Sequence, residues 1–196
     1  MCCKIVSWVL GRMEEDGIMN IILTGYRGTG KTTIGRALAE LTGWEFIDTD
    51  DIIEKMEGKS IRDIFLKYGW QYFRRVEKKV IRKVAKFDNE IIAVGGGAFM
   101  YKENLCLKEN AKVVLLIAPP EVLSERIKND PNRPPLTDAQ SSIEEIRAVW
   151  ARRRERYYAV ADVVVDTRDG NAKRAAEEIT RKLDIRKVIR TYAVGD

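Results

Sequence analysis

Short apolar segments alternate with amphipathic segments along most of the chain. Five apolar segments are rich in β-branched residues and have the length of strands: residues 20–24, 45–48, 91–95, 112–118 and 162–167. Helical patterns lie between and beyond them, near residues 31–42, 51–67, 70–87, 102–109, 120–129, 141–159 and 171–184, with a break expected at Gly58. Strands that alternate with helices in this way form parallel sheets covered by helices. The pattern predicts a three-layer α/β/α fold around a five-stranded parallel sheet.

The loop after the first strand, "GYRGTGKT" at residues 25–32, has the spacing of a phosphate-binding loop: Gly, four residues, Gly, Lys, Thr. Its glycines let backbone N–H groups turn toward an anion, and the following helix adds the positive end of its dipole. Lys31 is expected to reach the β- and γ-phosphates, and Thr32 to bind Mg²⁺. A glycine-rich turn with a solvated Lys31 is the alternative. Because a strand precedes the loop and a helix follows it, we expect a P-loop NTPase fold.

The composition excludes several kinds of chemistry. The 196 residues include no histidine, and the three cysteines have no C-x-x-C spacing, so a zinc site or a Ser/Cys–His nucleophile lacks its components. Acid–base work must fall to carboxylates or lysines. The net charge of +5 could indicate nucleic acid, but 30 acidic residues are spread among the 35 basic ones. A positive pocket for an anionic ligand explains the excess as well, and no nucleic-acid partner is expected.

The first 18 residues, "MCCKIVSWVLGRMEEDGI", are interpreted as an N-terminal extension, because "MEED" stands where a signal peptide would have small residues. Met13 and Met19 are alternative starts. The expected domain spans residues 19–186, and residues 187–196 form a tail. No segment approaches the roughly 18 apolar residues of a membrane span, so we expect no membrane partner and a reducing, cytoplasmic setting.

Residues 129–140, "NDPNRPPLTDAQ", interrupt the regular pattern with three prolines between two helices. Long loops in compact domains are usually functional, and a phosphotransferase needs to exclude water. We interpret the segment as a mobile lid that carries Arg133; a surface excursion is the alternative.

Three further segments supply candidates for an acceptor site. In "DTDD", strand alternation would place Asp48 and Asp50 on one side, Asp48 for the metal and Asp50 for an acceptor hydroxyl; a solvated turn or helix cap is the alternative. Arg74 and Glu77 share a helical face, either in a site or as a surface ion pair. Gly95, Gly96 and Gly97 leave bare backbone at the end of the third strand, where α/β sheets bind ligands. In the arginine run at 152–156, only one or two side chains can point inward.

These segments, in this order, resemble shikimate kinase, a family of P-loop kinases related in fold to nucleoside monophosphate kinases. The resemblance covers about residues 20–183 and rests on "GYRGTGKTTIG", "FIDTDDIIE", "GKSIRDIFLKYGWQYFRRVE", "AVGGGA", "NRPPL" and "RRERYYAVAD". It implies ATP-dependent phosphorylation of the 3-hydroxyl of shikimate, a step in chorismate and aromatic amino-acid biosynthesis, with ATP and Mg²⁺ and by a monomer.

The resemblance also implies roles for individual residues. Catalytic roles fall to Lys31, Asp50 and Arg133. Nucleotide binding falls to Gly28, Thr29, Gly30, Lys31, Thr32, Thr33, Arg126 near the adenine, and Arg133. The metal would be bound by Thr32 and Asp48. Shikimate would be bound by Asp50, Arg74, Gly95, Gly96, Gly97 and Arg153, with Gly96 donating from its backbone and the two arginines holding the carboxylate.

Some positions depart from the family pattern or leave a choice open. Trp70 replaces an acidic residue and is expected to lie outside the contact shell, whereas Pro135 in the lid adds a φ constraint. Arg153 is selected by its spacing from Tyr157 in R-x-x-x-Y; a shift to Tyr158 would select Arg154. A kinase of the same fold acting on gluconate or a nucleoside monophosphate is the second hypothesis. A nucleotide switch or nucleic-acid-binding protein is a third, but neither a basic stripe nor an N-K-x-D motif supports it.

Overall fold

The strand β1 (Asn20–Thr24) forms the centre of a parallel sheet, and all of its residues are buried. The computed structural model describes residues 19–128 and 141–185. The strand order is β2-β3-β1-β4-β5, where the outer four strands are β2 (Glu45–Asp48), β3 (Glu90–Ala93), β4 (Ala111–Ile117) and β5 (Val163–Asp166). Every neighbouring pair is parallel. The predicted five-stranded parallel sheet is confirmed.

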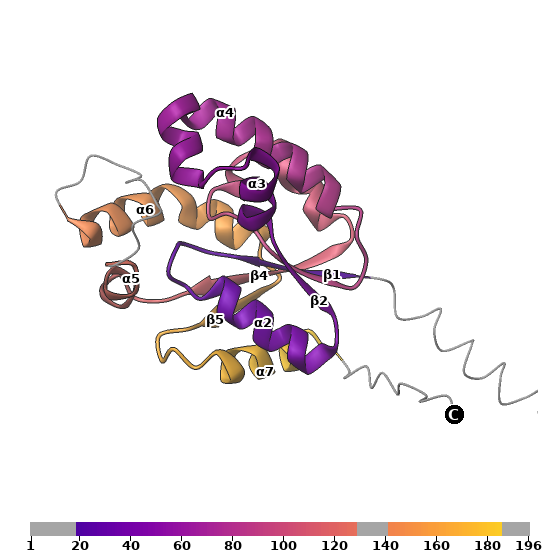
Figure 1. The fold of residues 1–196 in the computed structure, drawn as a ribbon. Helices are drawn as coiled ribbons and strands as arrows, with labels where there is room; N and C mark the ends of the chain where they lie inside the picture. Colours follow the sequence, from indigo (N-terminus) through magenta and orange to yellow (C-terminus); the bar gives the residue numbers. More distant parts are fainter. Residues whose placement is uncertain (1–18, 129–140, 186–196) are drawn as a thin grey trace, which may run out of the picture.

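Helices cover both faces of this sheet (Figure 1). One face is covered by α2 (Lys31–Thr42) and α7 (Ala172–Lys182), and the other by α4 (Ile61–Val84) and α6 (Ser142–Val160). The shorter elements are α3 (Thr49–Glu57), which packs on α4, α5 (Pro120–Ile127), and the 3₁₀ helices η1 (Ala98–Met100) and η2 (Lys102–Lys108). The result is the expected three-layer arrangement.

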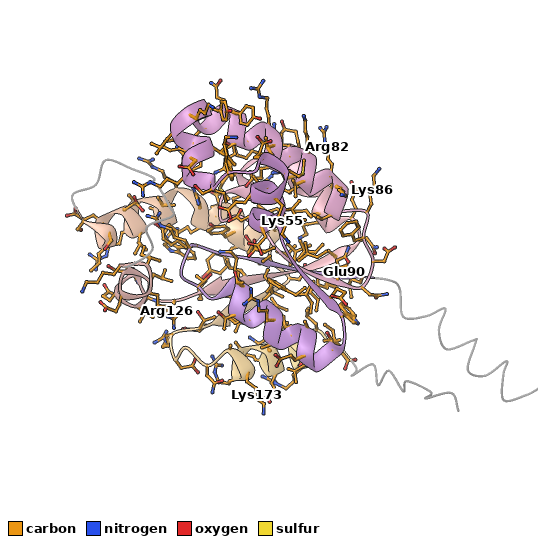
Figure 2. All side chains as sticks on the ribbon, in the orientation of Figure 1. Lys55, Arg82, Lys86, Glu90, Arg126 and Lys173 are labelled. Atoms are coloured by element: carbon orange, nitrogen blue, oxygen red, sulfur yellow. The ribbon has the colours of Figure 1, made fainter. Side chains whose placement is uncertain are left out.

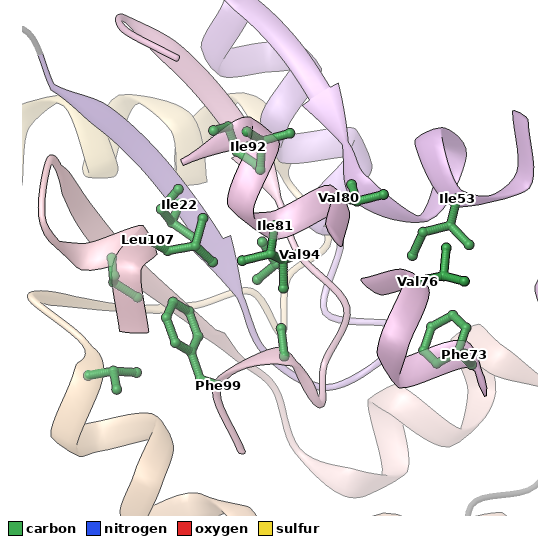
Figure 3. Packing of buried hydrophobic residues seen from close by; sticks show 14 of the residues in the cluster. Ile22, Ile53, Phe73, Val76, Val80, Ile81, Ile92, Val94, Phe99 and Leu107 are labelled. Atoms are coloured by element: carbon green, nitrogen blue, oxygen red, sulfur yellow. The ribbon is translucent and has the colours of Figure 1, made fainter. Parts of the chain in front are cut away.

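The two-residue period of β1 divides the core between the two helical layers. Ile22 faces the α4 layer, where it belongs to a cluster with Ile81 and Phe99 (Figure 3). Its neighbours Ile21 and Leu23 belong to the opposite cluster, together with buried residues of α2 and α7. Because successive side chains of a strand point to opposite faces, an apolar strand can serve two cores at once. This double burial fixes the position of the loop that follows β1.

Several predicted boundaries are confirmed and others are corrected. Gly58 ends α3 in the left-handed conformation, and Ser60 caps α4 by accepting from the N–H of Asp63. The helical segments expected at 51–67, with its break at Gly58, and near 70–87 correspond to α3 and the two parts of α4, which meet at Gly69, where a non-helical φ of 76° kinks the helix. The segment expected as an α-helix at 102–109 is the 3₁₀ helix η2. The strand expected at 91–95 ends earlier, since the chain leaves the sheet after Ala93.

The proposed lid, the N-terminal extension and the C-terminal tail lie outside the described residues. Within the described ranges, no helix is both long and apolar enough to cross a membrane.

Gly35 of α2 packs directly against β2, which supplies a test of this packing. A Cβ at position 35 would lie 2.1 Å from the Phe46 ring. We expect Gly35→Ala to lower the free energy of unfolding by about 1–3 kcal/mol, the usual cost of overpacking. This is the opposite of the gain of roughly 1 kcal/mol that alanine brings to an unhindered helix position. Urea denaturation measures the change, and Phe46→Leu in the same protein should restore part of the loss. Equal or greater stability of Gly35→Ala would contradict this packing.

Candidate active site

The loop between β1 and α2 has the backbone geometry of an anion-binding site. Gly25, Gly28 and Gly30 all have positive φ values, of 141°, 82° and 89°. A Cβ at Gly25 would lie 2.3 Å from the carbonyl oxygen of Leu116, so no other residue fits there without displacing β4. Among the described residues, no side chain caps the N-terminus of α2, and its first turn carries no acidic residue. The first N–H groups of α2 are therefore available to an anion.

A cavity of about 340 Å³ opens in front of this loop. That volume falls in the usual range for ligand pockets, roughly 300–1,000 Å³. Its walls include the predicted residues Gly28, Thr29, Gly30, Lys31, Thr32, Thr33, Asp48, Asp50 and Arg126. The loop after β5 completes the wall with Thr167, Gly170, Asn171 and Ala172, which sequence reasoning missed. The turn residues "DGN" directly after a strand could have indicated this part, because it too ends at the carboxyl edge of the sheet.

Lys31 and Arg126 brace the phosphate loop from two sides. The Lys31 Nζ donates to the carbonyl oxygens of Gly25 at 3.1 Å and Tyr26 at 3.2 Å. Arg126, at the end of α5 (Figure 2), donates to the carbonyl oxygen of Thr167 at 2.7 Å and to that of Gly28 at 3.3 Å. Arg126 thus joins the phosphate loop to the loop after β5, and residues of both loops line the same cavity.

Asp48 and Asp50 converge on the cavity, but not for the predicted reason. The strand β2 ends at Asp48 and α3 begins at Thr49, so strand alternation does not extend to Asp50. Asp48 caps α3 by accepting from the N–H of Asp50 at 3.0 Å, while Thr49 is buried and donates to the carbonyl oxygen of Ala93. The other Asp48 oxygen accepts from the hydroxyl of Thr32 at 2.9 Å. Asp48 is therefore a helix cap and a neighbour of the phosphate loop at once.

A second, smaller pocket of about 80 Å³ adjoins the first. It is lined by the predicted residues Asp50, Arg74, Gly95, Gly96, Gly97 and Arg153, and also by Tyr26, Arg27, Ile61, Trp70, Phe73 and Glu77. We call it the acceptor pocket. Asp50 lines both cavities, so a group bound in one lies beside a group bound in the other.

Arg74 is held in the acceptor pocket by a buried carboxylate. Its Nη1 donates to both oxygens of Glu77, at 2.7 and 2.6 Å, and the Glu77 side chain is only 1% exposed. The alternative of a surface ion pair is therefore wrong. A Cβ at Gly97 would lie 2.5 Å from Nη2 of Arg74, so glycine is required there for the guanidinium to occupy this place. The glycines after β3 thus make room for cationic side chains.

Two members of the arginine run point inward: Arg156, whose Nε donates to the carbonyl oxygen of Phe99 at 3.0 Å, and Arg153, which lines the acceptor pocket. Its Nη1 donates to the carbonyl oxygen of Gly96 at 3.0 Å, and the buried Tyr157 hydroxyl donates to the same oxygen. Arg154 is exposed, so the choice of Arg153 through Tyr157 agrees with the geometry. The predicted donation from the Gly96 backbone is a separate contact, and it stays a prediction.

Trp70 corrects another expectation. It lies in the wall of the acceptor pocket rather than outside the contact shell, and its ring centroid is 5.3 Å from the Arg74 guanidinium carbon. Guanidinium groups are attracted to aromatic faces at such distances. Tyr26 and Arg27 of the phosphate loop also line this pocket and were missed, because the loop pattern leaves their positions unconstrained. Arg133 lies outside the described residues.

Burial raises the pKa of Glu77, and the Arg74 guanidinium beside it counteracts part of that rise. The folded state therefore binds this proton more tightly than the unfolded chain does. The contribution of Glu77 to stability is full below its unfolded pKa, about 4.3, and is lost as the pH rises through its folded pKa.

We expect a carbon-detected NMR titration to place the pKa of Glu77 above the ordinary carboxyl range, and Arg74→Met to raise it further. Glu178, whose pKa is lowered by its hydrogen bond to Lys182, serves as the control and should not respond. A Glu77 pKa that is unchanged by Arg74→Met would show that the guanidinium does not act on this carboxylate.

Comparison with known proteins gives one consistent family. The family model described as shikimate kinase matches residues 27–184. Shikimate kinase of Caldanaerobacter subterraneus subsp. tengcongensis is 40% identical over 165 residues, which cover 83% of this chain and 94% of the relative. That of Moorella thermoacetica is 42% identical over 84% of this chain and 94% of the relative. The structure of shikimate kinase from Acinetobacter baumannii in complex with shikimate superimposes with a TM-score of 0.81 at 36% identity, covering 88% of this chain and 96% of that one. The chain belongs to the shikimate kinase family.

Proposed function

We propose that this protein transfers the γ-phosphoryl group of ATP to the 3-hydroxyl of shikimate, giving shikimate 3-phosphate and ADP. The reaction is a step in chorismate and aromatic amino-acid biosynthesis. The observation that carries the proposal is the junction of two pockets at Asp50, one bounded by a phosphate loop and the other by two anchored guanidinium groups. Membership of the family supports the same reaction.

The phosphate-loop cavity supplies the nucleotide site in this proposal. Backbone N–H groups of residues 28–33 and the ammonium of Lys31 bind the phosphates, and Arg126 borders the adenine. The positive charge of Lys31 stabilises the negative charge on the transferring group, which is the main contribution a protein can make to phosphoryl transfer.

The acceptor pocket supplies selectivity for a carboxylated polyol. Arg74 and Arg153 enter it from different helices, and forked guanidinium groups match the planar geometry of a carboxylate. Each is fixed by a contact of its own, Arg74 by Glu77 and Arg153 by the Gly96 carbonyl, so the carboxylate meets preorganised donors. A neutral sugar or a nucleobase would offer no carboxylate to these two guanidinium groups.

Asp50 connects the two pockets chemically. The acceptor hydroxyl oxygen forms a bond to the γ-phosphorus while the bond from that phosphorus to the ADP oxygen breaks. The hydroxyl proton passes to the Asp50 carboxylate, which orients the nucleophile in line with the leaving group.

Thr32 and Asp48 would hold a magnesium ion between them and the phosphates. Their oxygens lie 2.9 Å apart at the edge of the nucleotide cavity, and both are the hard oxygen donors that Mg²⁺ prefers. Within residues 19–128 and 141–185, no cluster of three or more His, Cys, Asp or Glu side chains could hold a metal by itself. When bound, Mg²⁺ neutralises phosphate charge.

The proposal also covers the setting of the enzyme. Residues 19–186 act as one kinase domain and as a monomer in the cytoplasm; the lid expected at residues 129–140 lies outside the described residues. The free thiol of Cys106, the cysteine within the described residues, is compatible with a reducing compartment.

Two variants should separate acceptor chemistry from nucleotide binding. Asp50→Asn keeps the side-chain shape but loses the base, so kcat should fall by roughly 10²–10⁴-fold, with little change in the KM for ATP.

Arg74→Lys should chiefly raise the KM for shikimate, because lysine cannot form the bidentate contact. Steady-state kinetics with each substrate varied in turn gives both values. If Arg74→Lys weakened ATP and left the shikimate KM unchanged, Arg74 would belong to the other pocket.

A further inference from the structure

Arg27 is a third arginine in the wall of the acceptor pocket. It occupies one of the positions that the phosphate-loop pattern leaves open, and its side chain is 15% exposed. Although Arg27 belongs to the phosphate loop, it lines the acceptor pocket and not the nucleotide cavity. The three guanidinium groups of this pocket thus come from three different elements: the phosphate loop, α4 and α6.

A buried carboxylate anchors Arg27 from the first turn of α6. Glu145 accepts a hydrogen bond from Nη2 of Arg27 and another, at 2.9 Å, from the hydroxyl of Tyr26. The Glu145 side chain is 6% exposed. Burial is the main cause that raises the pKa of Tyr26 to about 12, so its hydroxyl remains a neutral donor at physiological pH. Glu145 and Arg27 therefore form a charge-balanced pair in a largely desolvated place, where either charge alone would be costly.

The same helix serves the acceptor pocket at two points. Glu145, Val149, Arg153 and Tyr157 recur every four residues and so lie along one side of α6. Val149 packs with Tyr26 in a small apolar cluster, which holds this side of α6 against the phosphate loop. Glu145 then fixes Arg27 at one end, while Arg153 and Tyr157 contact Gly96 farther along.

We propose that Arg27 is a specificity-determining residue of the acceptor pocket, and that Glu145 is the positioning residue that holds its guanidinium there. The inference rests on the proposed function and adds a contact to the acceptor. The arrangement matches that of Arg74 and Glu77, in which a buried carboxylate orients a guanidinium at the pocket. A guanidinium has five N–H donors, so it can contact its carboxylate and acceptor oxygens together. The acceptor it favours is small, anionic and rich in oxygen.

Arg27→Met removes the guanidinium and keeps an unbranched apolar side chain in place of the arginine stem. We expect it to raise the KM for shikimate by roughly tenfold to a hundredfold, the usual effect of losing a hydrogen bond to a charged group. The KM for ATP should stay within about twofold, because the loop N–H groups and Lys31 are retained. Arg27→Lys keeps the positive charge, so its KM for shikimate should lie between that of the wild type and that of Arg27→Met.

A double variant separates acceptor contact from a purely structural pair. Arg27→Met alone leaves Glu145 charged and buried, so the midpoint of thermal unfolding of this variant should fall below that of the wild type. Arg27→Met with Glu145→Gln removes both charges and keeps an oxygen for the Tyr26 hydroxyl, so the midpoint should recover while the shikimate KM stays high. Glu145→Gln alone should raise that KM as well, and its effect should not add to that of Arg27→Met. The matched control is Arg147→Met, which breaks the exposed ion pair between α6 and Glu121 and should alter neither KM.

A shikimate KM that recovers with stability in the double variant, or that never rises in Arg27→Met, would overturn the inference. So would an ATP KM that rises as much as the shikimate KM. The activity of the wild-type protein distinguishes failure of the proposed function from failure of the role proposed for Arg27. If it turned over no shikimate, both the proposed function and the role of Arg27 would fail, whereas an active wild type with an unaffected Arg27→Met variant would remove Arg27 alone.

Discussion

The uncapped N-terminus of α2 at the end of β1 is the constraint on which the rest of the site depends. The backbone N–H groups there are available to an anion, and they are held in place because β1 is bonded to strands on both sides and buried on both faces. At position 25 a Cβ would collide with the Leu116 carbonyl oxygen of β4, so the loop can follow this path beside the sheet only with glycine there. Everything that must face the transferred phosphoryl group is consequently arranged around one rigid strand exit, at the edge where open α/β sheets bind ligands.

The second principle of the site is the use of buried carboxylates to orient cations. Glu77 holds Arg74, Glu145 holds Arg27, and both guanidinium groups line the acceptor pocket. Buried ion pairs contribute little to stability compared with apolar packing, but removing one partner is costly. Such pairs therefore fix where a guanidinium points. A carboxylate that entered such a pocket, as we propose, would meet preorganised donors, whereas flexible surface lysines would lose entropy on binding.

Much of this organisation could be predicted from the sequence, because local rules govern it. The apolar period of β1 and the glycine spacing of the phosphate loop depend on neighbouring residues, and both are observed. Asp48 and Asp50 do converge, although a helix start rather than a strand brings them together. The pocket walls at Trp70 and Arg27 could not be predicted, since they depend on tertiary contacts; Arg27 and Glu145 are 118 residues apart in the chain. The periodicity of neighbouring residues gives no information about a contact between residues so far apart in the sequence.

The central claim is that the two pockets joined at Asp50 transfer phosphate from ATP to shikimate. The most direct measurement is ADP release by the full-length protein with Mg²⁺ and ATP, with shikimate, gluconate and AMP as rival acceptors. The account predicts a kcat/KM that is highest for shikimate by orders of magnitude, with one shikimate 3-phosphate formed for each ADP released. ADP release that does not depend on shikimate, or a preference for AMP, would contradict it.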